Sequence, residues 1–124
     1  MASKFVIKET KTGIKFDLKA SNGQVIATSE VYSSISACKK GIESVKTNAL
    51  VAETEDQTIE EYEVKKNPKF EMYTDKSENT RFRLKARNGQ IIATSEEYKS
   101  KASCINGIES VVKNAPEAVV VEEK

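Results

Sequence analysis

The two cysteines are the side chains whose chemistry is easiest to recognise in this sequence. Cys38 and Cys104 stand at matching places on the apolar stripes of two expected helices. A thiol can act as a redox partner or a nucleophile when its surroundings lower its pKa. The chain contains no His, so the most common partner for activating a thiol is missing. We therefore interpret both cysteines as small buried core residues and rank a Cys-dependent enzyme last.

The absence of His limits other chemistry as well, because His is the most common general base and metal ligand. Two Cys alone cannot supply the four ligands of a closed structural zinc site. Glu43 and Glu109 occupy matching positions and would suggest a carboxylate pair for acid/base work, but both fall on expected helices, where we expect them to be solvated. The sequence thus predicts no catalytic residue, no metal site and no cofactor, and it favours a protein that is not an enzyme.

Basic residues recur at alternate positions of two expected strands and could form a face that binds a polyanion. Charge is also segregated: residues 1–49 carry a net +4 and residues 67–115 a net +3, against −4 for 50–66 and −2 for 116–124. Such a face can attract nucleic acid. The candidate binding face consists of Lys15, Lys19, Arg81, Arg83, Lys85 and Arg87.

Aromatic residues give this face little support. Sheets that bind RNA usually present aromatic rings on which bases stack. Phe16 and Phe82 alternate away from the basic side, which leaves Tyr73 as the one candidate for stacking. We therefore favour a solvated strand face whose charge is offset by the acidic segments, and keep weak nucleic-acid binding as an alternative.

The sequence contains an internal duplication. A shift of 66 residues places Phe16–Ala49 on Phe82–Ala115 with 22 identities in 34 positions. Several polar residues occur in both copies; they either line a binding surface around a pseudo-twofold axis or, for Asn and Tyr, shape turns and cover the strand-to-helix corner. These pairs are Asn22/Asn88, Gln24/Gln90, Glu30/Glu96 and Tyr32/Tyr98.

Alternation of apolar and polar residues predicts three strands in each copy. Asn22-Gly23 and Asn88-Gly89 predict hairpins with type I′ turns between the second and third strands. The expected strands are 4–8, 15–21 and 25–28 in the first copy and 69–73, 81–87 and 91–94 in the second.

A helix follows in each copy, with Ser34 and Ser100 as N-caps. Gly41 and Gly107 fall mid-helix, where Gly costs about 1 kcal/mol relative to Ala; this suggests close contact with the sheet or the other helix. A fourth strand is expected after each helix, at 58–64 in the first copy and at 118–122 in the second.

One such unit is too small to bury a sizeable core alone. We therefore predict an α+β fold in which two tandem β-β-β-α-β repeats, 4–64 and 69–122, form a single domain, 1–124. This domain would have one pseudo-twofold antiparallel sheet with two helices packed on one face. Pro68 marks the join between the repeats.

Three motifs, repeated in the same order, resemble the YegP-like family of uncharacterised proteins: Leu18–Ile26, Thr28–Tyr32 and Gly41–Val45, and again Leu84–Ile92, Thr94–Tyr98 and Gly107–Val111. The resemblance implies C-terminal strands that are exchanged between the repeats, so that 118–122 pairs in the half of the first repeat. The connector of this chain, 53–64, is longer and more acidic than is usual in the family, which leaves open which part of it forms the strand. The family brings no established catalytic residue, cofactor or substrate.

The sequence shows no targeting segment and no run of apolar residues long enough to span a membrane. Two Cys do not make a secreted disulfide framework, so we expect a cytoplasmic protein. We predict a monomer with internal pseudo-symmetry that acts as a small non-catalytic binding or interaction protein. The ligand or partner is not specified by the sequence.

Overall fold

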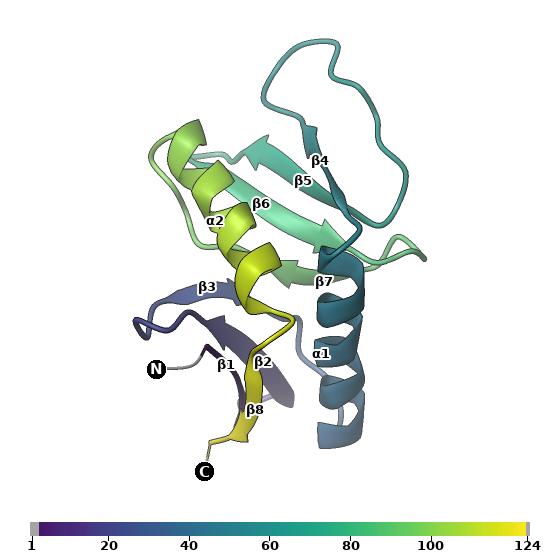
Figure 1. Ribbon diagram of the computed structural model, residues 1–124, viewed down its shortest axis with the longest axis vertical. Coiled ribbons are helices and arrows are strands. Elements are labelled where there is room, and N and C mark those ends of the chain that lie inside the picture. The colour runs from purple at the N-terminus through teal and green to yellow at the C-terminus, as the bar shows by residue number, and fades with distance from the viewer. Residues whose placement is uncertain (1–2, 124) are drawn as a thin grey trace.

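The duplicated pattern folds into duplicated elements, and the computed structural model describes them over residues 3–123. Residues 1, 2 and 124 of the predicted domain lie outside the described residues. Each copy gives three strands, a helix and a fourth short strand (Figure 1). In chain order these are β1 (Lys4–Glu9), β2 (Ile14–Lys19), β3 (Val25–Thr28), α1 (Ile35–Ala49), β4 (Glu53–Asp56), β5 (Lys69–Thr74), β6 (Thr80–Lys85), β7 (Ile91–Thr94), α2 (Lys101–Asn114) and β8 (Val119–Glu122).

All strands join one eight-stranded sheet in the order β4-β5-β6-β7-β3-β2-β1-β8. The two repeats meet at the centre, where β3 and β7 pair through Thr28 and Thr94. The fourth strands are exchanged: β8 pairs with β1 of the first repeat, and β4 pairs with β5 of the second. The exchange implied by the family resemblance is therefore confirmed.

The sheet is mixed, whereas we expected an antiparallel one. The strands of each β-β-β unit pair antiparallel, but both exchanged strands run parallel to their neighbours. Parallel neighbours need a crossover connection between them, and here a helix precedes each fourth strand. After that helix, the fourth strand runs in the same direction as the first strand of the opposite repeat.

Both helices cover the same face of the sheet (Figure 1). Helix α1 packs on β1 and β2 of its own repeat and also on β5, β6 and β7 of the other. The rings of Phe5, Phe16, Phe70 and Phe82 are fully buried beneath the helices and belong to one hydrophobic cluster. The two repeats thus share their core. None of the described helices is long and apolar enough to cross a membrane.

The hairpin between the second and third strands is confirmed in both repeats, but its turn is not type I′. A type I′ turn needs positive φ at both central residues. Only Gly23 has it (φ 85°), and Gly23 N donates to Ala20 O at 2.9 Å. The loop therefore has three residues, Ser21 to Gly23, with the Gly in the left-handed conformation that closes such loops. The second repeat has the same geometry at Gly89.

The helix N-caps are also confirmed: Ser34 Oγ accepts from Ala37 N, and Ser100 Oγ from Ser103 N, both at 3.1 Å. The mid-helix glycines were expected to make close contact with the sheet or the other helix. A tyrosine ring is the nearest neighbour of each, and at Gly107 the ring of Phe82 on β6 of the sheet is also close. A Cβ on Gly41 would overlap the hydroxyl and ring of Tyr32, which sits at the strand-to-helix corner. Gly107 and Tyr98 repeat this arrangement.

The fourth strand of the first repeat is not at 58–64, where alternation suggested it, but at the start of the connector, whose strand position the family resemblance had left open. The strand is β4, and residues 57–68 form a loop that projects at the top of Figure 1. Ile59, Tyr62 and Val64, whose alternation suggested a strand, are exposed to solvent. In the earlier position of the strand, the carboxylates of Glu55 and Asp56 form ion pairs with Lys69 and Lys101.

Candidate functional site

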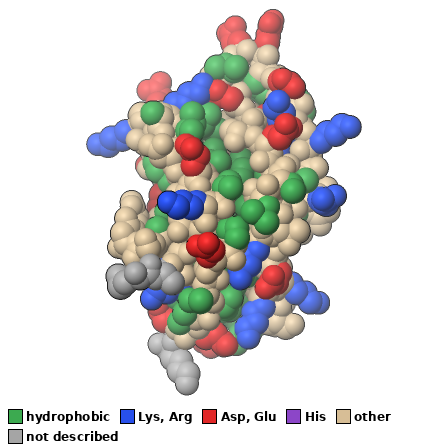
Figure 2. Space-filling model, in the orientation of Figure 1, with side chains coloured by type: hydrophobic (Ala, Val, Ile, Leu, Met, Phe, Trp, Pro, Cys, Tyr) green, Lys and Arg blue, Asp and Glu red, His purple; other side chains and the backbone are tan. Residues whose placement is uncertain are grey.

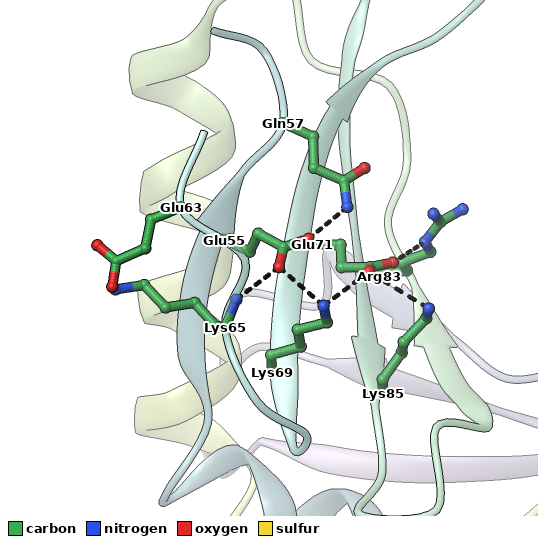
Figure 3. A network of polar contacts seen from close by, with 8 residues as sticks. All are labelled: Glu55, Gln57, Glu63, Lys65, Lys69, Glu71, Arg83 and Lys85. Carbon is green, nitrogen blue, oxygen red and sulfur yellow. Dashed lines mark hydrogen bonds and ion pairs between the residues drawn. The ribbon is translucent and has the colours of Figure 1, made fainter. Parts of the chain in front are cut away.

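A network of charged side chains covers the sheet face opposite the helices, at the β4 end (Figure 3). Its centre is Glu55, whose side chain is 2% exposed. Glu55 Oε1 accepts from Lys69 Nζ at 2.8 Å and from the backbone N–H of Lys65 at 2.7 Å, while Oε2 accepts from Gln57 Nε2 at 2.5 Å. The network thereby fastens the loop after β4 to the sheet.

Glu71 extends this network across β5 and β6. Its Oε1 accepts from Arg83 Nε at 2.6 Å, and its Oε2 lies 3.3 Å from both Lys69 Nζ and Lys85 Nζ. Burial alone raises the pKa of Glu55, but hydrogen bonds from Lys69, Gln57 and Lys65 outweigh it and lower that pKa to about 2. The pKa of Glu71 is lowered by its contacts in the same sense, against the effect of burial.

These shifts keep both carboxylates charged at neutral pH. A general acid or base needs a pKa near the working pH, and neither carboxyl has one. The network is suited to holding β4 and the connector in place and not to moving protons.

The predicted basic face is largely engaged within the protein. Arg83 and Lys85 contact Glu71, and Arg81 contacts Asp75 at 2.8 Å and Glu97 at 2.7 Å. Lys15 Nζ lies 3.0 Å from Thr28 Oγ1 and 3.5 Å from Asp17 Oδ1. Within residues 3–123, no carboxylate lies within 4.0 Å of the amino or guanidinium nitrogens of Lys19 and Arg87.

The sheet does not bring the six basic residues together as one patch. Those of β2 and those of β6 are separated by β7 and β3. Tyr73, the candidate for base stacking, already has the Arg83 guanidinium 4.7 Å from its ring centroid. The helix-covered face carries acidic and basic side chains interspersed (Figure 2). Nucleic-acid binding by these residues stays a prediction.

Both cysteines are fully buried and unbridged. Burial raises the pKa of Cys38, and burial together with the charge of Asp56 raises the pKa of Cys104 to about 11. A thiol with a raised pKa is a poor nucleophile at neutral pH. Among the described residues, no group of three or more Cys, Asp or Glu side chains is placed to hold a metal ion.

The paired polar residues have structural roles where the structure shows contacts for them. Asn22 Oδ1 accepts from Gln24 N at 2.9 Å, and Asn88 does the same for Gln90, so both Asn close their own turns. Tyr32 and Tyr98 cover the strand-to-helix corners and stack on Phe16 and Phe82 with centroids 6.3 Å apart. Glu30 and Glu96 are exposed.

The outer edge of β8 is an exposed apolar surface that no sequence motif pointed to. Val119, Val120 and Val121 are 53%, 41% and 40% exposed. Val119 N donates to Ser3 O at 3.2 Å and Glu123 N to Ile7 O at 2.7 Å. Because backbone groups alternate along a strand, those of Val120 and Glu122 point to the outer edge, where the sheet order places no further strand among the described residues.

A hollow of about 540 Å³ opens at the end of this strand, between β1, β2, β8 and the start of α1. Its lining combines three apolar side chains, three carboxylates and one amine: Ile7, Ile14, Ile35, Glu9, Glu122, Glu123 and Lys8. Lys8 also contacts Asp17 at 2.5 Å. The run of three valines between two acidic positions was the signal in the sequence that could have identified this edge.

Comparisons with known proteins place this geometry in a family. Residues 11–56 and 71–122 match the family described as a domain of unknown function (DUF1508). The chain is 42% identical to the UPF0339 protein YegP of Yersinia pestis over 94% of this chain and 91% of that protein. It is 67% identical to a UPF0339 protein of Treponema denticola over 54 residues, which are 44% of this chain and 93% of that protein.

A solved structure has the same fold. The solution NMR structure of the UPF0339 protein SO3888 from Shewanella oneidensis matches with a TM-score of 0.80 and 34% identity, over 98% of this chain and 92% of that chain. Neither the family description nor these relatives carry an assigned function. The chain belongs to the UPF0339 family of proteins of unknown function, which includes YegP.

Proposed function

We propose that this protein is a non-catalytic binding protein that binds its partner along the outer edge of β8. The observation that carries the proposal is the contrast between the two edges of the sheet. The pseudo-twofold makes β4 and β8 equivalent, yet β4 reads Glu-Thr-Glu-Asp and β8 reads Val-Val-Val-Glu.

Edge strands offer unpaired backbone groups to other chains, and proteins usually protect them with charge or cover. The β4 edge is protected in this way by its acidic residues, and Glu55 also binds the following loop. The β8 edge has exposed β-branched residues and no such charge until Glu122. An exposed apolar edge in one of two equivalent positions supports a binding role for it.

The proposal that the protein is not an enzyme rests on how its reactive groups are engaged. The buried carboxylates are ion-paired with lowered pKa values, and the thiols are buried with raised ones. Exposed polar residues present in both repeats act in turns or face solvent. This distribution favours binding over catalysis.

We also propose that the free protein is a monomer in the cytoplasm. The exchange of β4 and β8 within one chain already completes the sheet that a single repeat would need a second copy to complete. Two buried thiols without a disulfide suit a reducing compartment.

The binding role can be tested with an unbiased library of heptapeptides selected on the immobilised protein. We expect selected peptides to shift the backbone amide signals of Val119, Val120, Val121 and Glu122 in ¹H–¹⁵N spectra. Peptides that instead shift only β5 and β6 signals on the charged face, or a selection without binders, would contradict the proposal.

A further inference from the structure

We propose that the partner of β8 is an extended peptide segment with Lys or Arg among alternating apolar residues. It would add to the sheet as a ninth strand, with one basic side chain in the hollow at the end of β8. This inference rests on the proposed function and specifies its ligand. Both the backbone of β8 and the lining of the hollow support it.

The backbone supplies two pairs of hydrogen-bonding groups at the correct spacing. The N–H and C=O of Val120 and of Glu122 face outward, because Val119 N and Glu123 N are bonded to β1. An added strand makes its main affinity through such groups and its specificity through alternate side chains. The contact with β8 therefore requires an extended partner and not a helix.

The side chains beside this edge call for alternating apolar residues. Val119 and Val121 lie opposite Lys4 and Val6 in the register with β1, while Val120 lies opposite Phe5 on the helix-covered side. Phe5 and Val6 are buried, so Val120 extends the apolar helix-covered face out to the edge, and Val121 lies beside Val6 on the other face. A neighbouring strand with apolar residues at alternate positions would cover them.

The hollow sets the charge of the ligand. Its apolar part comes from Ile7, Ile14 and Ile35, and Glu9, Glu122 and Glu123 bring three carboxylates against one amine, Lys8, which already contacts Asp17. A long side chain with an apolar stem and a cationic end fits such a lining.

Lys39 contacts one of these carboxylates but binds it only weakly. Its Nζ lies 3.6 Å from Glu122 Oε2, and both side chains are about half exposed. An exposed pair of this kind is worth little and exchanges easily for another cation. An incoming guanidinium or amine can therefore take this place.

A second copy of the chain fits this edge less well. Four residues of strand give much less contact than the roughly 1,200 Å² of a stable interface. Antiparallel pairing of two β8 strands would also bring two acidic segments close together, since Glu117, Glu122 and Glu123 flank the valines. A basic peptide meets the same charges with attraction.

The test uses two fluorescein-labelled peptides, Lys-Val-Lys-Val-Lys-Val-amide and the counterpart with Glu at each Lys position, in fluorescence anisotropy titrations. At low salt we expect the basic peptide to bind at least tenfold more tightly. Its affinity should fall several-fold at about 0.5 M salt, because screening acts on exposed charges. Bound peptide should shift the amide signals of Val120 and Glu122.

Variants separate the backbone contribution from the charge contribution. Val120→Pro removes an outward N–H without removing a bond to β1, and we expect a tenfold or greater loss of affinity; Thr54→Pro at the equivalent place on β4 is the control. The double variant E122Q/E123Q should reduce binding of the basic peptide about tenfold, with Glu53→Gln as the control. Circular dichroism checks that each variant is folded.

A basic peptide with its alternate amides N-methylated on the pairing edge tests the strand geometry without changing the protein. Equal affinity of the methylated and unmethylated peptides would overturn the proposal, as would equal affinity of the Lys and Glu peptides. Protection of the Val120 amide by self-association of the free protein would make a second copy the occupant and also overturn it. If library peptides bind β8 without a preference for basic residues, the binding function stands and the basic ligand is refuted.

Discussion

Glu55 connects the chemistry of one side chain to the path of the chain around it. Its carboxylate joins β4 to Lys69 on β5 and accepts the N–H of Lys65 from the connector. A buried carboxylate that accepts several hydrogen bonds holds its charge strongly, and it costs much stability when the charge or a partner is lost.

We predict that Glu55→Gln lowers the free energy of unfolding by roughly 3–5 kcal/mol, the range for breaking a buried ion pair. Lys69 would keep Glu71 as a partner but lose its 2.8 Å contact. Urea denaturation at pH 7 measures the change. Glu53→Gln, at an exposed position of the same strand, is the control and should shift stability by less than about 0.5 kcal/mol. An equal loss of stability in the two variants would show that the buried contacts of Glu55 do not stabilise the fold.

The same network predicts how stability depends on pH. The pKa of Glu55 is lowered from 4.5 to about 2 in the folded protein, so its contribution is complete above pH 4.5 and is lost as the pH falls through 2. We expect the wild-type protein to lose stability steeply between these values and Glu55→Gln to lose less. Parallel curves for the two proteins in chemical denaturation from pH 2 to 5 would contradict the assignment.

At Cys38 and Cys104 the structure predicts low reactivity. Both are fully buried and have raised pKa values, so we expect labelling by a disulfide reagent at neutral pH to require unfolding. Labelling rates should rise together in denaturant, and Cys38→Ser should leave the rate at Cys104 slow if the fold is kept. Fast labelling of either thiol in the native protein would contradict this prediction and support the alternative that the protein is a Cys-dependent enzyme.

The sequence could identify the basic residues but not their partners. Arg83 faces Glu71 only in the register of β5 with β6, and Glu55 reaches Lys69 only because β4 is exchanged into the second repeat. Such pairs depend on which strands become neighbours. A single sequence shows the charges but not that neighbour relation.

Each helix packs through a glycine against the tyrosine at the strand-to-helix corner of its own repeat. Tyr32 pairs with Ile14, the first residue of β2, through an isolated β-bridge, and its hydroxyl fills the space beside Gly41. Helix propensity favours Ala over Gly by about 1 kcal/mol, but the ring leaves no room for a Cβ.

We predict that Gly41→Ala destabilises the protein by about 1–3 kcal/mol, the range for overpacking a core, despite the better helix former. Combined with Tyr32→Ala, the cost should be less than the sum of the single changes, because the clash is absent. Thermal or urea unfolding of the four proteins in this cycle measures the coupling. Additive effects, or a gain in stability for Gly41→Ala alone, would refute the contact.

Most elements were predictable because their signals are local. Alternation indicated the three strands of each repeat, and the Ser hydroxyls indicated the helix starts. The fourth strands depend on contacts far along the chain, and this is why Ile59, Tyr62 and Val64 misled the prediction while Glu53–Asp56 formed the strand. The outer edge of β8 was missed for the same reason, since an edge is defined by the whole sheet.

The molecule as a whole consists of two halves with the same order of strands and helix, and these halves differ in the sequence of their fourth strands, β4 and β8. The three-stranded units and helices repeat closely, but the exchanged strands are acidic at one edge and apolar at the other. One edge is thus tied down by ion pairs while the other is left exposed. A duplicated chain can specialise in this way, whereas a symmetric pair of identical repeats has two equal edges.

The one-domain interpretation predicts that residues 1–66 alone are either unfolded or dimeric. In the full chain, α1 of this half packs on β5, β6 and β7, and β4 pairs with β5, so the isolated half loses both partners.

In a dimer of this half, β4 of one copy could lie along β1 of the other, because Lys4–Ile7 is the counterpart of Lys69–Met72. Residues 67–124 are the matched fragment: their β8 carries three valines and could cover β5 of a second copy, so we expect this half to form the tighter dimer. Sedimentation equilibrium and circular dichroism over a concentration series measure both halves. A monomeric 1–66 that unfolds cooperatively would show that one repeat can complete its own core, and the duplication would then be two domains side by side.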